Sequence, residues 1–164
     1  MLSVRALIGS DGPGVLRINS DGQPGVAQLD DSELSRLCSL PNHHLVAEDI
    51  DSLLVGYILA FDREAAYDGE EFLRFRLMTP KPYVYVDQIA VAKESKGLGV
   101  GRALYDAVEV VARREGAHAL CCEVNTVPRN PESMAFHEAL GFRRVGSMAT
   151  SDGREVELLL REIA

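Results

Sequence analysis

Hydrophobic and polar positions change their period most clearly between Tyr83 and Gly116. Residues 83–91 are rich in β-branched and aromatic side chains and carry one charge, which predicts a strand buried on at least one face. After a glycine-rich break, apolar residues return from Gly101 onward at the spacing of one helix face. Gly116 is the type of residue that commonly closes a helix. The pattern predicts a strand, a glycine-rich turn and a helix, in that order.

Shorter patterns predict the other elements. A first strand is expected over residues 2–9, followed by one or two helical turns and a loop. Asp30 or Asp31 is expected to cap a short helix that Pro41 stops, and Asn130 to cap another that Gly141 ends. The remaining expected elements are strands at 43–49, 52–61 and 119–124, a helical piece at 70–77 and two closing strands around 151–153.

The glycine-rich turn contains Gly97, Gly99 and Gly101. The first N–H groups of a helix lack internal partners and lie at the positive end of its dipole. Glycines remove the Cβ atoms that would hold a large anion away from those donors, so the turn is expected to bind a phosphate. The spacing fits neither nucleotide fingerprint, because Arg102 stands at the third Rossmann glycine and no Walker Gly-Lys-Ser/Thr follows. The alternative is a glycine-rich connection that binds nothing.

The sequence KGLGVG, which begins five residues after the strand end IAV, resembles the acetyl-CoA signature of the GNAT superfamily, the Gcn5-related N-acetyltransferases. In that family the backbone amides of this turn hold the pyrophosphate of coenzyme A, and the preceding strand pairs with the pantetheine arm. One departure is a lysine where Arg or Gln is usual, which keeps the charge but loses the planar fork. The resemblance implies that coenzyme A binds at Ile89, Ala90, Val91, Lys96, Gly97, Leu98, Gly99, Val100, Gly101 and Arg102.

A second stretch, from Asn130 to Phe142, resembles the family pattern Asn-x-x-(Ala/Ser)-x-x-(Phe/Leu)-(Tyr/His)-x-x-x-Gly-Phe. It also contains the FHxxLGF motif found in some predicted acetyltransferases. The asparagines of this region can bond the cofactor or their own turn, since a side-chain amide serves either partner. Through the resemblance, the cofactor site is expected to include Asn125, Asn130, Ser133, Phe136 and His137.

The resemblance implies a single GNAT-like α/β (α+β) domain over residues 1–164. Its expected architecture is a mixed, mostly antiparallel sheet of six to seven strands, flanked by about four helices, with a splayed parallel pair at the centre. The implied activity is an acyl-CoA-dependent N-acyltransferase that moves an acetyl group from acetyl-CoA directly to a primary amine. Two other interpretations stay open: a non-catalytic acyl-CoA-binding sensor or partner module, and an unrelated nucleotide-binding domain, which the glycine spacing disfavours.

Acyl transfer from a thioester to an amine needs a base, donors for the oxyanion and a proton for the leaving thiolate. Asp87 is the first candidate base, because it lies two residues before Ile89 and therefore on the same strand face. Glu123 on the next strand is the second; either acid can instead make a structural hydrogen bond or ion pair. His137 stands where the family commonly has Tyr and is the candidate acid, with a plain hydrogen bond to cofactor or backbone as the alternative. Backbone N–H groups near residues 89–91 are the expected oxyanion donors.

The long polar segment 62–82 is expected to border the acceptor site, as insertions at this place do in the family. Tyr67, Phe72 and Phe75 are candidates for the acceptor wall, together with Asp87. The alternative for the three aromatic residues is packing in the core, which is common for aromatic side chains at helical spacing.

The net charge of −8 argues against a nucleic-acid partner and is compatible with a cationic amine. No apolar run reaches the roughly 18 residues of a membrane span, and the amino terminus lacks a signal-peptide pattern, so a cytoplasmic protein without a membrane partner is expected. Cys38, Cys121 and Cys122 lack metal-ligand spacing, so no metal is expected and packing is the predicted role of Cys121 and Cys122. A homodimer is compatible with the sequence, which does not determine the oligomeric state.

Overall fold

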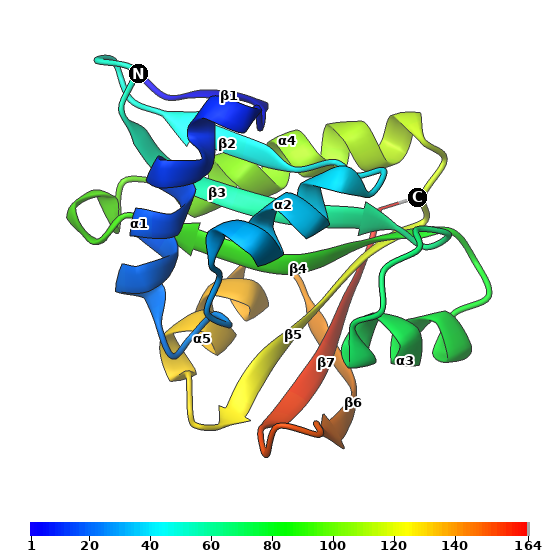
Figure 1. The fold of residues 1–164 in the computed structure, drawn as a ribbon. Coiled ribbons are helices and arrows are strands. Elements are labelled where there is room, and N and C mark those ends of the chain that lie inside the picture. Colours follow the sequence, from blue (N-terminus) through cyan, green and yellow to red (C-terminus); the bar gives the residue numbers. More distant parts are fainter. Residues whose placement is uncertain (164) are drawn as a thin grey trace.

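The computed structural model describes residues 1–163, and a seven-stranded mixed sheet runs through it (Figure 1). The strand order is β1-β2-β3-β4-β5-β7-β6. All neighbours pair antiparallel except β4 and β5, which are parallel, so the expected sheet is confirmed. The strands are β1 (Ser3–Ala6), β2 (Leu45–Glu48), β3 (Leu54–Asp62), β4 (Tyr83–Val91), β5 (Ala119–Val127), β6 (Arg143–Ala149) and β7 (Glu155–Glu162).

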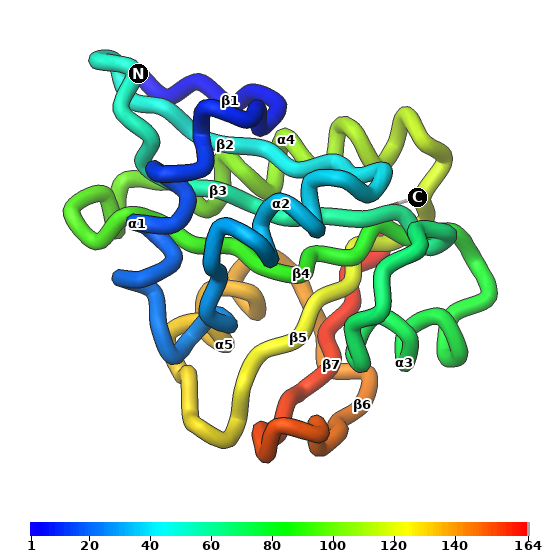
Figure 2. The backbone as a smooth tube through the Cα atoms, viewed as in Figure 1, coloured from blue at the N-terminus to red at the C-terminus, as the bar shows by residue number. Residues whose placement is uncertain are grey.

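The two central strands separate soon after they pair. Their register runs from Tyr83 opposite Ala119 to Tyr85 opposite Cys121. Beyond that point β4 continues against β3, and β5 continues against β7. Figures 1 and 2 show the result as a V, with β4 and β5 diverging from their shared end. Beyond their paired ends, both strands contribute residues to one cavity, such as Asp87 of β4 and Glu123 of β5.

Five α-helices cover the two faces of the sheet within residues 1–163, one more than expected. On one face, α1, α2 and α3 bury residues such as Val15, Leu37 and Phe75. On the other face, α4 and α5 pack through residues such as Leu104 and Phe136. The helices are α1 (Gly12–Gly22), α2 (Asp31–Ser39), α3 (Glu70–Met78), α4 (Val100–Arg114) and α5 (Pro131–Ala139), with 3₁₀ turns at Gly9–Asp11 and Lys93–Ser95.

The predicted helix boundaries have identifiable chemical causes. Asp30 caps α2, because its Oδ1 accepts from the Glu33 N–H at 2.7 Å. Asn130 caps α5 in the same way, accepting from the Ser133 N–H at 3.3 Å. Gly116 follows α4 with φ of 77°. Helix α1 differs from expectation, since it extends for 11 residues rather than one or two turns.

Two further features are the burial of the cysteines and the hydropathy of the helices. Cys121 and Cys122 are buried in the cores on opposite faces of the sheet, as expected for neighbouring strand residues, whereas Cys38 is half-buried. None of the helices in the described part of the chain combines the length and apolar character that crossing a bilayer requires.

Candidate active site

The turn before α4 forms one wall of a cleft of about 570 Å³ between β4 and α5. Gly97 and Gly99 have φ of 78° and 83°, the left-handed conformation that side chains rarely adopt. A Cβ at either position would meet no atom within 4 Å, so the turn presents open space there. Lys96 and Arg102 are exposed on either side of these glycines. The first N–H groups of α4 and two cations therefore border the cleft, a combination that suits a phosphate.

Gly101 serves another purpose than the two glycines before it. A Cβ at Gly101 would lie 2.8 Å from the Phe136 ring, so the missing side chain lets α4 approach α5. Gly101 still lines the cleft, but the absence of its side chain serves the packing of the two helices. Leu98 is 70% exposed and lies outside the cleft lining, unlike the other residues expected at the cofactor site.

A second cavity of about 320 Å³ adjoins the cleft where β4 and β5 part. Its walls include Asp87 and Tyr67, two of the residues expected at the acceptor site, and Glu123, the second candidate base. The two cavities share part of their lining, so a molecule in one reaches a molecule in the other. The shared residues are Pro24, Gly25, Val26, Ile89, Asn125, Ser133 and His137.

Asp87 occupies a β-bulge in the signature strand. Val86 and Gln88 pair with the adjacent residues Ala60 and Leu59 of β3, which leaves Asp87 as the extra residue between them. The bulge interrupts the alternation of faces, and Asp87, Gln88 and Ile89 all line the smaller cavity. Strict alternation predicts that only the first and third of these would do so.

Each candidate base is hydrogen-bonded by a tyrosine. The Tyr67 hydroxyl donates to Asp87 Oδ1, and the Tyr85 hydroxyl lies beside Glu123 Oε2, both at 2.7 Å. Burial raises the pKa of Asp87 to about 6, although the hydrogen bond from Tyr67 opposes this rise. Burial, with Glu71 and Asp87 as acidic neighbours, raises the pKa of Glu123 well above its ordinary value. At neutral pH, therefore, Asp87 is mostly ionised, whereas the surroundings of Glu123 favour its protonated form.

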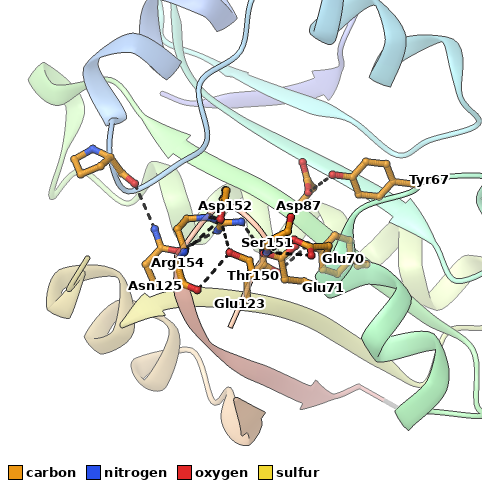
Figure 3. Close-up of polar contacts among 12 residues, drawn as sticks. Tyr67, Glu70, Glu71, Asp87, Glu123, Asn125, Thr150, Ser151, Asp152 and Arg154 are labelled. Atoms are coloured by element: carbon orange, nitrogen blue, oxygen red, sulfur yellow. Dashed lines mark hydrogen bonds and ion pairs between the residues drawn. The ribbon is translucent and has the colours of Figure 1, made fainter. Parts of the chain in front are cut away.

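Arg154 provides the cationic partner of the acidic cavity. Its guanidinium donates to Glu71 Oε1 at 2.9 Å, to Asp152 Oδ2 at 2.9 Å and to Asn125 Oδ1 at 3.2 Å. Figure 3 shows this cation between the carboxylates of α3, of β5 and of the turn before β7. Neither Glu71 nor Arg154 was expected in the site, because they lie 83 positions apart in the sequence.

The α3 helix and the turn between β6 and β7 are joined at the rim of this cavity. The Ser151 N–H donates to both carboxylate oxygens of Glu70, each at 3.1 Å. Together with the ion pair of Glu71 and Arg154, this bond fixes the turn against the start of α3 (Figure 3). Glu70 and Glu71 thus hold one wall of the cavity in place.

His137 lies at the junction of the two cavities and is 2% exposed. Its Nδ1 is 2.8 Å from the Ser133 carbonyl oxygen, which only accepts, so Nδ1 carries the proton. Its Nε2 is 2.8 Å from the Tyr105 hydroxyl and accepts from it. Burial lowers the pKa of His137, so the ring is neutral at pH 7 and Nε2 has no proton to give.

The three aromatic candidates for the acceptor wall separate in the structure. Tyr67 is half-buried, stacks on Phe61 with centroids 4.6 Å apart and lines the cavity. Phe72 and Phe75 are fully buried and lie in the core under α3, outside the cavity lining. Their core position follows from the helix, which turns both rings toward Tyr83 and Tyr85.

The other expected cofactor residues all border the larger cleft. They come from the end of β4, from the first residue of α4, from β5 and from the start of α5. These residues are Ile89, Ala90, Val91, Val100, Asn125, Asn130, Ser133 and Phe136. Residues 1–163 contain no cluster of three or more His, Cys, Asp or Glu side chains placed to hold a metal ion.

The sequence profile of the acetyltransferase (GNAT) family matches residues 15–142. The chain belongs to this family. It is 31% identical over 98 residues to the 5-NmdU N-acetyltransferase of Pseudomonas phage PaMx11. That match covers 60% of this chain and 65% of the relative, so the chain spans less than two thirds of the relative's length.

Solved structures share the fold at low sequence identity. Ard1 from Thermoplasma volcanium superposes with a TM-score of 0.78 at 20% identity, covering 99% of this chain and 98% of that one. A GNAT superfamily phosphinothricin acetyltransferase from Sinorhizobium meliloti gives 0.74 at 21% identity, covering 99% and 89%. The latter structure is a complex with acetyl-CoA, so the ligand expected here is bound in a protein of the same fold.

Proposed function

We propose that the protein is an acetyl-CoA-dependent N-acetyltransferase that acetylates a primary amine by direct transfer. The observation that supports this most strongly is the meeting of the two cavities where β4 and β5 part. One cavity carries the anion-binding turn, and the other carries the carboxylates. An acyl donor and a cationic amine placed in them would meet beside Ile89 and Asn125.

The residues of the larger cleft fit coenzyme A. The left-handed glycines leave open space beside the first N–H groups of α4, where a pyrophosphate would lie. Lys96 and Arg102 supply positive charge, and a lysine binds a phosphate as a point charge without the bidentate geometry of arginine. The volume of about 570 Å³ is typical of a cofactor site. Acetyl-CoA, when bound, supplies the thioester that is the source of the acetyl group.

Asp87 is the better of the two candidate bases. An amine attacks only when neutral, so a base must accept the proton that its ammonium form carries. Asp87, with a pKa of about 6, is ionised at neutral pH and still basic enough to accept that proton. Burial and two acidic neighbours raise the pKa of Glu123 well above its ordinary value, so its ionised, proton-accepting form is less available. The Tyr67 hydroxyl orients the Asp87 carboxylate toward this task.

We assign His137 a positioning role in place of the acid role expected from the sequence. Its Nε2 accepts a hydrogen bond from the Tyr105 hydroxyl and its Nδ1 donates one to the Ser133 carbonyl, so both ring nitrogens already have protein partners. The amine nitrogen loses a second proton as the amide forms, and solvent can carry this proton to the leaving thiolate, whose thiol has a pKa near 8.5 and holds a proton at neutral pH. The ring keeps α5 in contact with α4 at the cavity junction.

The first experiment is a thermal-shift titration with acetyl-CoA, coenzyme A, ATP and NAD, since a ligand that binds only the folded state raises its apparent stability. We expect shifts with the two CoA ligands alone, followed by thiol release with a panel of primary amines. CoA binding without thiol release for any amine would instead indicate the non-catalytic sensor. Shifts only with ATP or NAD would contradict the assignment of the turn.

Two matched glycine variants test the turn itself. Gly99 and Gly116 lie at opposite ends of α4, with φ of 83° and 77° and open space around both. Glutamate at either position costs about 1–2 kcal/mol in backbone strain, so Gly99→Glu and Gly116→Glu should lose similar stability. Only Gly99→Glu places a carboxylate beside the pyrophosphate, and it should weaken CoA binding by about tenfold or more. Equal affinities of the two variants would show that the turn does not bind the pyrophosphate.

A further inference from the structure

The connection between α1 and α2, residues 23–29, forms a wall of both cavities. Pro24, Gly25 and Val26 line both of them, and Ala27 and Leu29 line the smaller. The segment has neither helical nor strand structure after the end of α1. Figure 2 shows it descending beside the opening between β4 and β5. Its position relative to those strands therefore determines the shape of both binding spaces.

Three buried polar side chains hold this segment from below. Asn19 Nδ2 and Gln88 Nε2 both donate to the Ala27 carbonyl, at 2.8 and 3.0 Å. The Leu29 N–H donates to Asn19 Oδ1 at 3.0 Å. The Tyr57 hydroxyl donates to Gln88 Oε1 at 2.8 Å, which turns the Gln88 amide nitrogen toward the segment. Asn19, Tyr57 and Gln88 are exposed by 1%, 0% and 5%.

The same segment is attached on its other side to the elements across the gap. Asn125 Nδ2 on β5 donates to the Pro24 carbonyl at 3.4 Å. A Cβ at Gly25 would lie 2.9 Å from Asn130 Nδ2 at the start of α5, so the backbone passes close against that side chain. The segment thus bridges the V, with Gln88 holding it to β4 and Asn125 holding it to β5.

We propose that Asn19, Tyr57 and Gln88 are positioning residues, which hold residues 23–29 across the parted strands as the shared wall of the donor and acceptor cavities. A buried polar group costs free energy unless it is hydrogen-bonded, and apolar side chains could fill the same space without that cost. The hydrogen bonds of this network reach the Ala27 carbonyl and the Leu29 N–H. Because residues 23–29 form neither helix nor strand, these backbone groups have no partners from regular secondary structure. The kinetic consequence rests on the proposed function, whereas the ordering of the segment does not.

The test compares two variants of the same strand. Gln88→Met removes the amide and keeps a side chain of similar length. Tyr83→Phe removes a buried hydroxyl that bonds the Phe72 carbonyl at 3.3 Å and has no contact with residues 23–29 in the hydrogen-bond network. Amide hydrogen exchange of Leu29 should be about tenfold or more faster in Gln88→Met than in Tyr83→Phe. Tyr57→Phe, a smaller change, should accelerate the same amide to a lesser extent.

Binding and kinetics complete the test. Gln88→Met should weaken coenzyme A binding several-fold and raise the KM of an amine substrate more than it lowers kcat, because the segment shapes both sites. Exchange of Leu29 as slow as in Tyr83→Phe would overturn the proposal. Faster exchange with unchanged CoA affinity would overturn it too, since the order of the segment would then be irrelevant to binding. If the wild-type protein acetylates no amine, the proposed function fails, but the exchange and affinity measurements still decide this inference.

Discussion

Replacing Asp87 with asparagine should abolish activity and, at neutral pH, stabilise the protein. The pKa of Asp87 rises from 3.8 to about 6 because the carboxylate is desolvated in the folded state. At about 1.36 kcal/mol for each factor of ten in proton affinity, the ionised carboxylate costs the folded state about 3 kcal/mol. Asparagine has the same shape and no charge, and its Oδ1 still accepts the hydrogen bond from Tyr67.

The direction of the pH dependence follows from proton binding. Between pH 3.8 and about 6 the unfolded chain has lost the Asp87 proton while the folded chain keeps it. The free energy of unfolding of the wild-type protein therefore falls as pH rises through this window, and it stays lower above it. The Asp87→Asn variant lacks this contribution, so the two proteins should have similar stability near pH 3.5 and differ by up to about 3 kcal/mol at pH 7.

The assay is thermal or urea unfolding across pH 3.5–7.5, with Asp106→Asn as the control. Asp106 is exposed on α4, and its replacement by asparagine likewise removes one negative charge from the protein. A gain of 3 kcal/mol corresponds to a rise in Tm of roughly 6–12 °C for a domain of this size. If Asp87→Asn were no more stable than Asp106→Asn at pH 7, the carboxylate would not be desolvated and its assignment as the tuned base would be wrong.

Three other substitutions test the site. His137→Phe should lower kcat by less than about tenfold. It should also reduce the free energy of unfolding, because it leaves the buried Tyr105 hydroxyl without its acceptor. A fall in kcat of about a hundredfold or more at constant KM would restore His137 as the acid. Tyr67→Phe removes a hydrogen bond that lowers the pKa of Asp87, so the acidic limb of the profile of kcat/KM against pH should move to higher pH. An unchanged profile would show that Tyr67 does not influence the base. Arg154→Gln removes a charge that also lowers the pKa of Asp87, so activity should fall at pH 7 and recover at higher pH. An equal loss of activity at all pH values would indicate that Arg154 has a structural role alone.

The elements that the sequence predicted correctly are those with strong local causes. β4 runs from Tyr83 to Val91 as expected, and the Asp30 and Asn130 caps bond the amides that define them. The length of α1 was underestimated because glycines and polar residues occupy much of it. Its stability comes from burial of Val15 and Ile18 against the sheet, a tertiary effect that local propensity does not contain.

The site was predictable where it depends on the backbone of one segment and unpredictable where it depends on distant contacts. Gly97 and Gly99 line the larger cleft, and the GNAT resemblance placed them in the cofactor loop, whereas the packing role of Gly101 depends on Phe136 in another helix. The bulge at Asp87 depends on the register of β3, so alternation alone could not place Gln88 in the cavity. Arg154 meets Glu71 only because the β6–β7 turn folds back on α3.

The charges in the smaller cavity support the proposed acceptor site over a purely structural role. Glu71, Asp87 and Glu123 line it together, and Arg154 is the cation that the cavity lining supplies. Each acidic neighbour raises the pKa of Glu123, so the closeness of the three carboxyl groups disfavours their ionised forms in the folded state. A buried charge that is imperfectly paired costs more than an apolar side chain of the same volume. A positively charged amine beside these groups would favour their ionised forms, so under the proposed function we expect their closeness to contribute to affinity for the acceptor.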